Sequence, residues 1–222
     1  MKEPIICYII CVALTAICVF TQALGSPVSD ITWFVAIFSL IAVPLIAVRY
    51  IHPRDEAGAG VTISWSAKDL LTGLAAVAIL LIPVALGNHF VRTVIQGLEF
   101  HFAWSNYANL QAPIYYEIFI QLMCVALPEE FFYRGYLQTA FLKFFKSRSK
   151  VEKYAPALAI VLASLCFACA HLPSGNMTRL LTFFPGLLFG FLRYRTGGLL
   201  GAIVCHAACN LMMTVLNVHY FG

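Results

Sequence analysis

The sequence predicts an all-α membrane protein, a bundle of about seven to eight spanning helices. Of its 222 residues, 61% are hydrophobic and only 11% are charged, whereas soluble domains carry roughly 25% charged residues. The mean hydropathy is +0.86. A water-soluble protein needs a charged, mixed surface, which this chain cannot supply. We therefore expect a single integral membrane domain over residues 1–222, embedded in the lipid bilayer.

Seven apolar runs divide the chain, and a spanning helix needs about 20 mostly apolar residues. The runs are 5–24, 31–48, 70–86, 113–145, 156–171, 180–194 and 199–218. The first is longer than a signal-peptide core and predicts a retained span. The fourth is too long for one bilayer crossing. Residues 87–112 are mixed and aromatic, which predicts an interfacial segment or a short extra helix that would be the eighth span.

The placement of lysine and arginine predicts the orientation of these spans. With the N-terminus in the cytoplasm, two of these residues, Arg92 and Arg179, lie outside and eleven lie inside. The eleven are Lys2, Arg49, Arg54, Lys68, Lys143, Lys146, Arg148, Lys150, Lys153, Arg193 and Arg195. Cytoplasmic loops of membrane proteins are enriched in lysine and arginine. We therefore expect a cell-membrane protein with a cytoplasmic N-terminus.

Net charge and cysteine placement exclude two other classes of protein. The net charge is only +4 and forms no basic stripe, so nucleic acid is not an expected partner. The eight cysteines all lie in apolar runs. Disulfide frameworks belong to short secreted chains with loop cysteines, so these cysteines are expected to pack as small apolar side chains.

Three charged residues interrupt the fourth run, in the segment Pro-Glu-Glu-Phe-Phe-Tyr-Arg at 128–134. A charge near the centre of a span costs about 2.5–3.5 kcal/mol. Glu130 and Arg134 are four residues apart, so they share a helix face and can pair. Glu129 points about 100° away and lacks that partner. A helix starting at Pro128 would explain the glutamates without a function, but apolar sequence on both sides favours a buried, catalytic Glu129.

Two later runs carry histidine. His171 ends the fifth run, and His206 lies in the seventh, four residues before Asn210 and on the same helix face. Each alone could be a structural contact between helices. Together with Glu129 they form the set that peptide hydrolysis requires, namely a base, a partner that shares the proton, and donors for the oxyanion.

These residues follow one another in an order that resembles a known family. Glu129-Glu130-x-x-x-Arg134, Phe167-x-x-x-His171 and His206-x-x-x-Asn210 are similar to the three motifs of the CPBP intramembrane glutamic endopeptidases, the family of CAAX-prenyl proteases and Abi proteins. The resemblance covers roughly residues 113–218, the expected catalytic core. Residues 1–112 would then supply N-terminal spans and the interfacial segment.

The resemblance implies an intramembrane endopeptidase that uses neither a metal nor another cofactor. Glu129 and His171 would activate water, and His206 and Asn210 would form the oxyanion hole. Glu130, Arg134 and Phe167 would support the site. The substrate would be a membrane-anchored protein or peptide, cut near its anchored or C-terminal end. No feature of the sequence specifies an oligomeric state.

Three alternatives stay open. A zinc protease could use the same glutamate and histidines with nearby cysteines, although no His-Glu-x-x-His motif occurs. A thiol enzyme could process C-terminal sorting signals in a sortase-like reaction, with Cys169 or Cys205 beside a histidine. A non-enzymatic immunity or scaffold protein could bind a peptide, or the buried charges could form an ion pathway.

Overall fold

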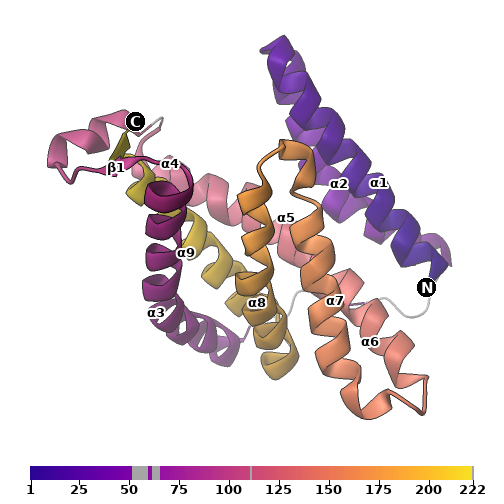
Figure 1. Cartoon of the computed structure of the whole chain (residues 1–222). Coiled ribbons are helices and arrows are strands. Elements are labelled where there is room, and N and C mark those ends of the chain that lie inside the picture. Colours follow the sequence, from indigo (N-terminus) through magenta and orange to yellow (C-terminus); the bar gives the residue numbers. More distant parts are fainter. Residues whose placement is uncertain (52–59, 62–65, 111, 222) are drawn as a thin grey trace.

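The computed structural model describes residues 1–51, 60–61, 66–110 and 112–221, and most of them are helical (Figure 1). The longer helices are α1 (Lys2–Thr21), α2 (Val28–Ile51), α3 (Ala67–Phe90), α7 (Ala155–Cys169), α8 (Phe183–Thr196) and α9 (Leu200–Asn217). The pair α1–α2 lies on one side of the molecule and the pair α3–α9 on the other, with α5, α7 and α8 between them. The predicted all-α class is confirmed.

Five helical stretches in the described chain are long and apolar enough to cross a membrane, at Lys2–Leu24, Val28–Tyr50, Ala67–Ile95, Glu152–Ser174 and Leu200–Asn217. The predicted count of seven to eight spans stays a prediction. Helix α8 has 14 residues, so it measures only about 21 Å at 1.5 Å per residue. That is shorter than the roughly 30 Å hydrocarbon core.

The long fourth run forms one winding helical path. It consists of α4 (Ile114–Phe119), a π-helical stretch (Ile120–Ala126), α5 (Leu127–Glu130), a second π-helical stretch (Phe131–Leu137) and α6 (Gln138–Lys146). Its two glutamates therefore lie in a short α segment between two π segments. Such bulges within helices are frequent at functional sites, which makes this path the first place to look for chemistry.

Residues 87–112 do not form an eighth spanning helix. Helix α3 continues into a π-helical stretch (Val91–Ile95), followed by strand β1 (Glu99–Phe100) and a 3₁₀ stretch (Trp104–Asn109). Strand β1 pairs antiparallel with β2 (Tyr220–Phe221) at the C-terminus, seen beside it in Figure 1. The described part of this segment adds no further helix long enough to span a membrane, and its own helical part is the six-residue 3₁₀ stretch. An interfacial position for this segment stays a prediction.

Helices α3 and α9 pack closely because glycines face each other. A Cβ atom at Gly73 would lie 2.5 Å from the Cα of Gly201. Small residues at such a crossing let two backbones approach within a membrane. This contact holds α9, which carries His206 and Asn210, against the remainder of the bundle.

Candidate functional site

The predicted pair of Glu130 and Arg134 forms and is completely buried. Nη1 of Arg134 donates to Oε1 of Glu130 at 2.9 Å, and both side chains are 0% exposed. Nη2 of Arg134 donates to the carbonyl of Gly186 at 3.4 Å. The guanidinium carbon also lies 4.3 Å from the ring centre of Phe167, a favourable cation–π distance. The pair thus links α5 and the π-helical stretch after it to α7 and α8.

His206 connects both glutamates. Its Nδ1 lies 2.7 Å from Oε1 of Glu130, and its Nε2 lies 3.6 Å from Oε2 of Glu129. The imidazole stacks on Phe189 with 5.0 Å between ring centres and 15° between planes. Because a carboxylate only accepts hydrogen bonds, Nδ1 is the donor toward Glu130. This contact fixes the orientation of the imidazole, whose side chain is only 5% exposed.

Phe167 is the hub around which the other side chains are arranged. Its ring lies 4.9 Å from that of His171, 5.1 Å from Tyr133 and 5.7 Å from His206, each in an edge-on geometry. Its backbone carbonyl lies 2.9 Å from Nδ1 of His171. A carbonyl accepts, so Nδ1 carries a proton, and in the neutral ring the lone pair is then on Nε2.

Glu129 and His171 share the wall of a cavity of about 210 Å³. Tyr133, one helical turn after Glu129, lines it as well. The remaining lining residues are Thr15, Cys18, Val19, Gln22, Trp33, Ala36, Ile37, Leu40, Cys124, Val125, Ala170, Ser174 and Arg179. A carboxylate and an imidazole therefore meet in a mostly apolar hollow between α1, α2 and the fourth-run helices.

Residues 111–212 match a family described as type II CAAX prenyl endopeptidase Rce1-like. Over these residues, just under half of the chain, the sequence is similar to this family. No curated protein and no solved structure matches the chain. The matched range contains all three motifs, so the resemblance seen in the sequence is confirmed for this part of the chain.

Asn210 does not contact the other motif residues through its amide. Its amide donates to Oε1 of Gln121 at 3.0 Å, and neither Asn210 nor His206 lines the cavity described above. The structure thus brings together Glu129, Glu130 and His206, and places Asn210 one turn further along α9.

Two residues near the site did not follow from the motifs. Tyr133 lines the cavity, and its spacing of four residues from Glu129 is the signal that indicates a shared helix face. Gln121 holds Asn210, and a lone amide in an apolar run is itself a sign of a partner in the bundle.

In the described residues, the zinc alternative receives no geometric support, and the thiol alternative does not receive it from the two cysteines that the sequence singled out. This part of the chain contains no group of three or more histidine, cysteine, aspartate or glutamate residues that could hold a metal ion. Cys169 and Cys205, the thiols beside the histidines, do not line the cavity. Cys18 and Cys124 do line it.

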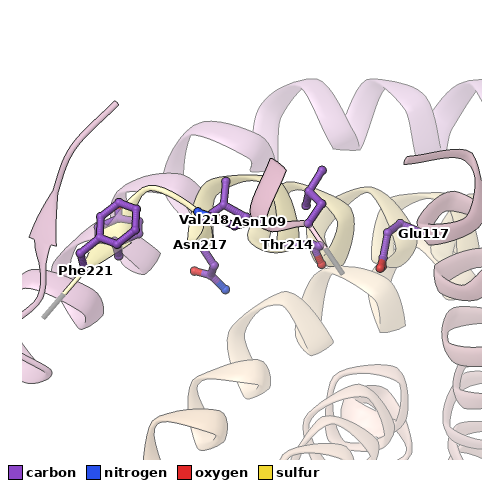
Figure 2. Close-up of a pocket in the computed structure, with 8 residues that line it drawn as sticks. Asn109, Glu117, Thr214, Asn217, Val218 and Phe221 are labelled. Carbon is purple, nitrogen blue, oxygen red and sulfur yellow. The ribbon is translucent and has the colours of Figure 1, made fainter. Parts of the chain in front are cut away.

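A second, larger cavity of about 500 Å³ lies near the C-terminal strand (Figure 2). Its lining includes Glu117, Thr214 and Asn217, and the amide oxygen of Asn217 accepts hydrogen bonds from Asn88 and Arg92. None of the motif residues lines it. The smaller cavity is therefore the one that holds predicted site residues, Glu129 and His171.

Proposed function

We propose that this CAAX-type protease hydrolyses peptide bonds by a glutamic mechanism with Glu129 as the general base. The observation that supports this role is the difference between two neighbouring glutamates. Glu130 is 0% exposed and is bound by both Arg134 and His206, whereas Glu129 keeps 22% of its side chain exposed and lines the cavity with His171. A carboxylate that reaches open space beside an imidazole can hold and deprotonate a water molecule.

In the proposed reaction, a water molecule binds between Glu129 and His171. Glu129 takes one proton while the water oxygen attacks the scissile carbonyl carbon, which moves an electron pair onto the carbonyl oxygen. Collapse of this intermediate breaks the C–N bond, and the proton passes to the leaving nitrogen directly or through Nε2 of His171. Nε2 can relay a proton because the Nδ1 proton is held by the Phe167 carbonyl.

His206 and Asn210 are the proposed donors to the oxyanion. A His206 that carries protons on both nitrogens would donate through Nδ1 to Glu130 and through Nε2 toward a substrate oxygen beside Glu129. The 3.6 Å between Nε2 and Oε2 of Glu129 places this nitrogen next to the base. Asn210 would exchange its bond to Gln121 for one to the substrate. Glu130, Arg134 and Phe167 position these groups.

The proposed substrate is a membrane-anchored protein or peptide, cut near its anchored or C-terminal end. The cavity supports this class because its apolar walls come from α1 and α2, both long and apolar enough to span a membrane. An apolar stretch of substrate would bury its side chains there while its scissile bond lies beside Glu129. Residues 113–218 would be the catalytic core of a cell-membrane protein with a cytoplasmic N-terminus.

The test is cleavage of a membrane-anchored reporter by the purified full chain. Glu129→Gln keeps the shape of the side chain but removes the base, so turnover should fall by about 100-fold or more. Glu117→Gln is the matched control, because Glu117 lies on the same helical path but lines the other cavity. Normal cleavage by Glu129→Gln would refute the proposal. So would wild-type activity that a chelator abolishes and zinc restores.

A further inference from the structure

The proposed active-site cavity is lined by segments that lie toward one end of the bundle. Its walls include the last turns of α1 (Thr15–Gln22), the first turns of α2 (Trp33–Leu40) and the connection after α7 (Ala170–Arg179). Figure 1 shows the α1–α2 turn and the α7–α8 connection at the same end, opposite the loop between α6 and α7. Phe132 and Leu137, which follow Glu129 along the helix toward that loop, are 0% exposed and do not line the cavity.

The lysines and arginines gather at the opposite end. Among the described residues, that end carries Lys2, Arg49, Lys68, Lys143, Lys146, Arg148, Lys150, Lys153, Arg193 and Arg195, whereas the cavity end carries Arg92 and Arg179. Lysine and arginine near span ends mark the cytoplasmic side of a membrane protein. The cavity end is therefore the extracytoplasmic one.

We infer that the protease takes its substrate from the extracytoplasmic side, as a peptide segment presented at the outer leaflet. This inference rests on the proposed function for the chemistry of the site. The walls define the segment, since Val19, Trp33 and Ile37 form an apolar hollow and Gln22, Ser174 and Arg179 are polar. An apolar stretch of the substrate binds in the hollow, and a carboxylate next to that stretch binds Arg179.

Arg179 is the specificity-determining residue in this arrangement. Its side chain is exposed and has no hydrogen bond or ion pair within the described ranges. A cation placed at the edge of an apolar hollow attracts an anionic group and disfavours a cationic one. The carboxylate can be an acidic side chain or the C-terminus of the substrate, and the two are separated below.

The orientation can be tested without any activity. In a full-length variant without cysteine, Met177→Cys places a thiol beside the cavity and Ser149→Cys places one in the loop between α6 and α7. A membrane-impermeant maleimide on intact cells should label the thiol at 177 and should reach the thiol at 149 only after permeabilisation. The reverse pattern would overturn the inference, whatever the enzyme's activity.

The substrate is tested with two single-span reporters that carry the same apolar cleavage segment, on the outer or the inner side of the span. In intact membranes, only the outer reporter should be cut, and in detergent both should be cut. Cleavage of the inner reporter alone in membranes would overturn the inference and leave the proposed mechanism standing. No cleavage of either reporter in detergent would instead refute the proposed function.

The role of Arg179 is tested by kinetics in detergent. Arg179→Gln should raise KM for an acidic reporter by up to about fivefold, the size expected for an exposed ion pair, with kcat unchanged. Arg195→Gln, at the opposite end, is the matched control. Reporters with an aspartate side chain, a free C-terminus or an amidated C-terminus identify which carboxylate is read. An equal KM for all three reporters with both variants would refute this role.

Discussion

At the scale of single residues, substitutions in the buried charge cluster should lower the stability of the protein most. Glu130 is 0% exposed, and Arg134 and His206 are its hydrogen-bond partners in the described structure. Removing one partner of a buried ion pair leaves a charge uncompensated, which costs about 3–5 kcal/mol. The geometry of the site therefore depends on the contacts of Glu130 with Arg134 and His206, which form only in the folded protein.

Arg134→Ala should lower the stability of the folded protein by roughly that amount. Arg134→Lys should lie between the alanine variant and the wild type, because a lysine keeps the charge but cannot reproduce the planar fork that reaches both Glu130 and the Gly186 carbonyl. Thermal unfolding in detergent measures both. An unchanged midpoint for the alanine variant would show that the pair contributes no stability.

Asn210 provides a second residue-scale prediction. As an oxyanion donor it should contribute to turnover, so Asn210→Ala should lower kcat by about 100–1000-fold. Gln121→Leu removes the partner that holds Asn210 without substrate, and it should leave kcat near the wild-type value. If the two variants lost activity equally, Asn210 would be a structural residue.

At the scale of elements, the crossing of α3 and α9 positions the third motif. Gly73→Ala would force a Cβ to within 2.5 Å of the Cα of Gly201, so the helices must separate. Overpacking of this kind costs about 1–3 kcal/mol, and the shift of α9 should also weaken turnover through His206.

Gly87→Ala on the same helix is the control for this crossing. In the described structure, no atom of another part of the protein lies within 4 Å of the place where a Cβ at Gly87 would be. Its unfolding temperature should therefore not fall below that of the wild type, because alanine also favours the helix, and its activity should match. A loss of equal size in both variants would mean that the close approach to Gly201 is not the cause.

At the scale of the whole molecule, the active site combines two parts of the chain. The proposed catalytic groups lie in the part that matches the CAAX protease family, at 111–212. The wall opposite Glu129 comes from α1 and α2, outside that match. Chemistry and substrate choice can therefore vary separately.

This division predicts that the wall sets which substrates fit. Ile37→Trp should partly fill the cavity and raise KM for a reporter with bulky apolar residues, with less effect on one with small residues. Phe38→Trp is the matched control, since the next residue on α2 is 61% exposed and does not line the cavity. If Ile37→Trp changed kcat and left KM unchanged with both reporters, the wall would not be acting on substrate fit alone.

The sequence by itself determined the class of the protein and its buried charge pair, because both follow from local properties. Hydropathy along the chain predicts membrane helices, and a spacing of four residues places Glu130 against Arg134. Three motifs in order likewise indicated the family that the comparison confirmed.

Only the tertiary structure decided which distant segments meet. Strand β1, in the middle of the chain, pairs with β2 at the C-terminus, and the described residues around β1 form no extra span. His206 reaches both glutamates from another helix, and the cavity wall comes from α1 and α2. Such contacts depend on how helices and strands far apart in the sequence pack together. The periodicity of an apolar run does not identify the helix or strand that it packs against.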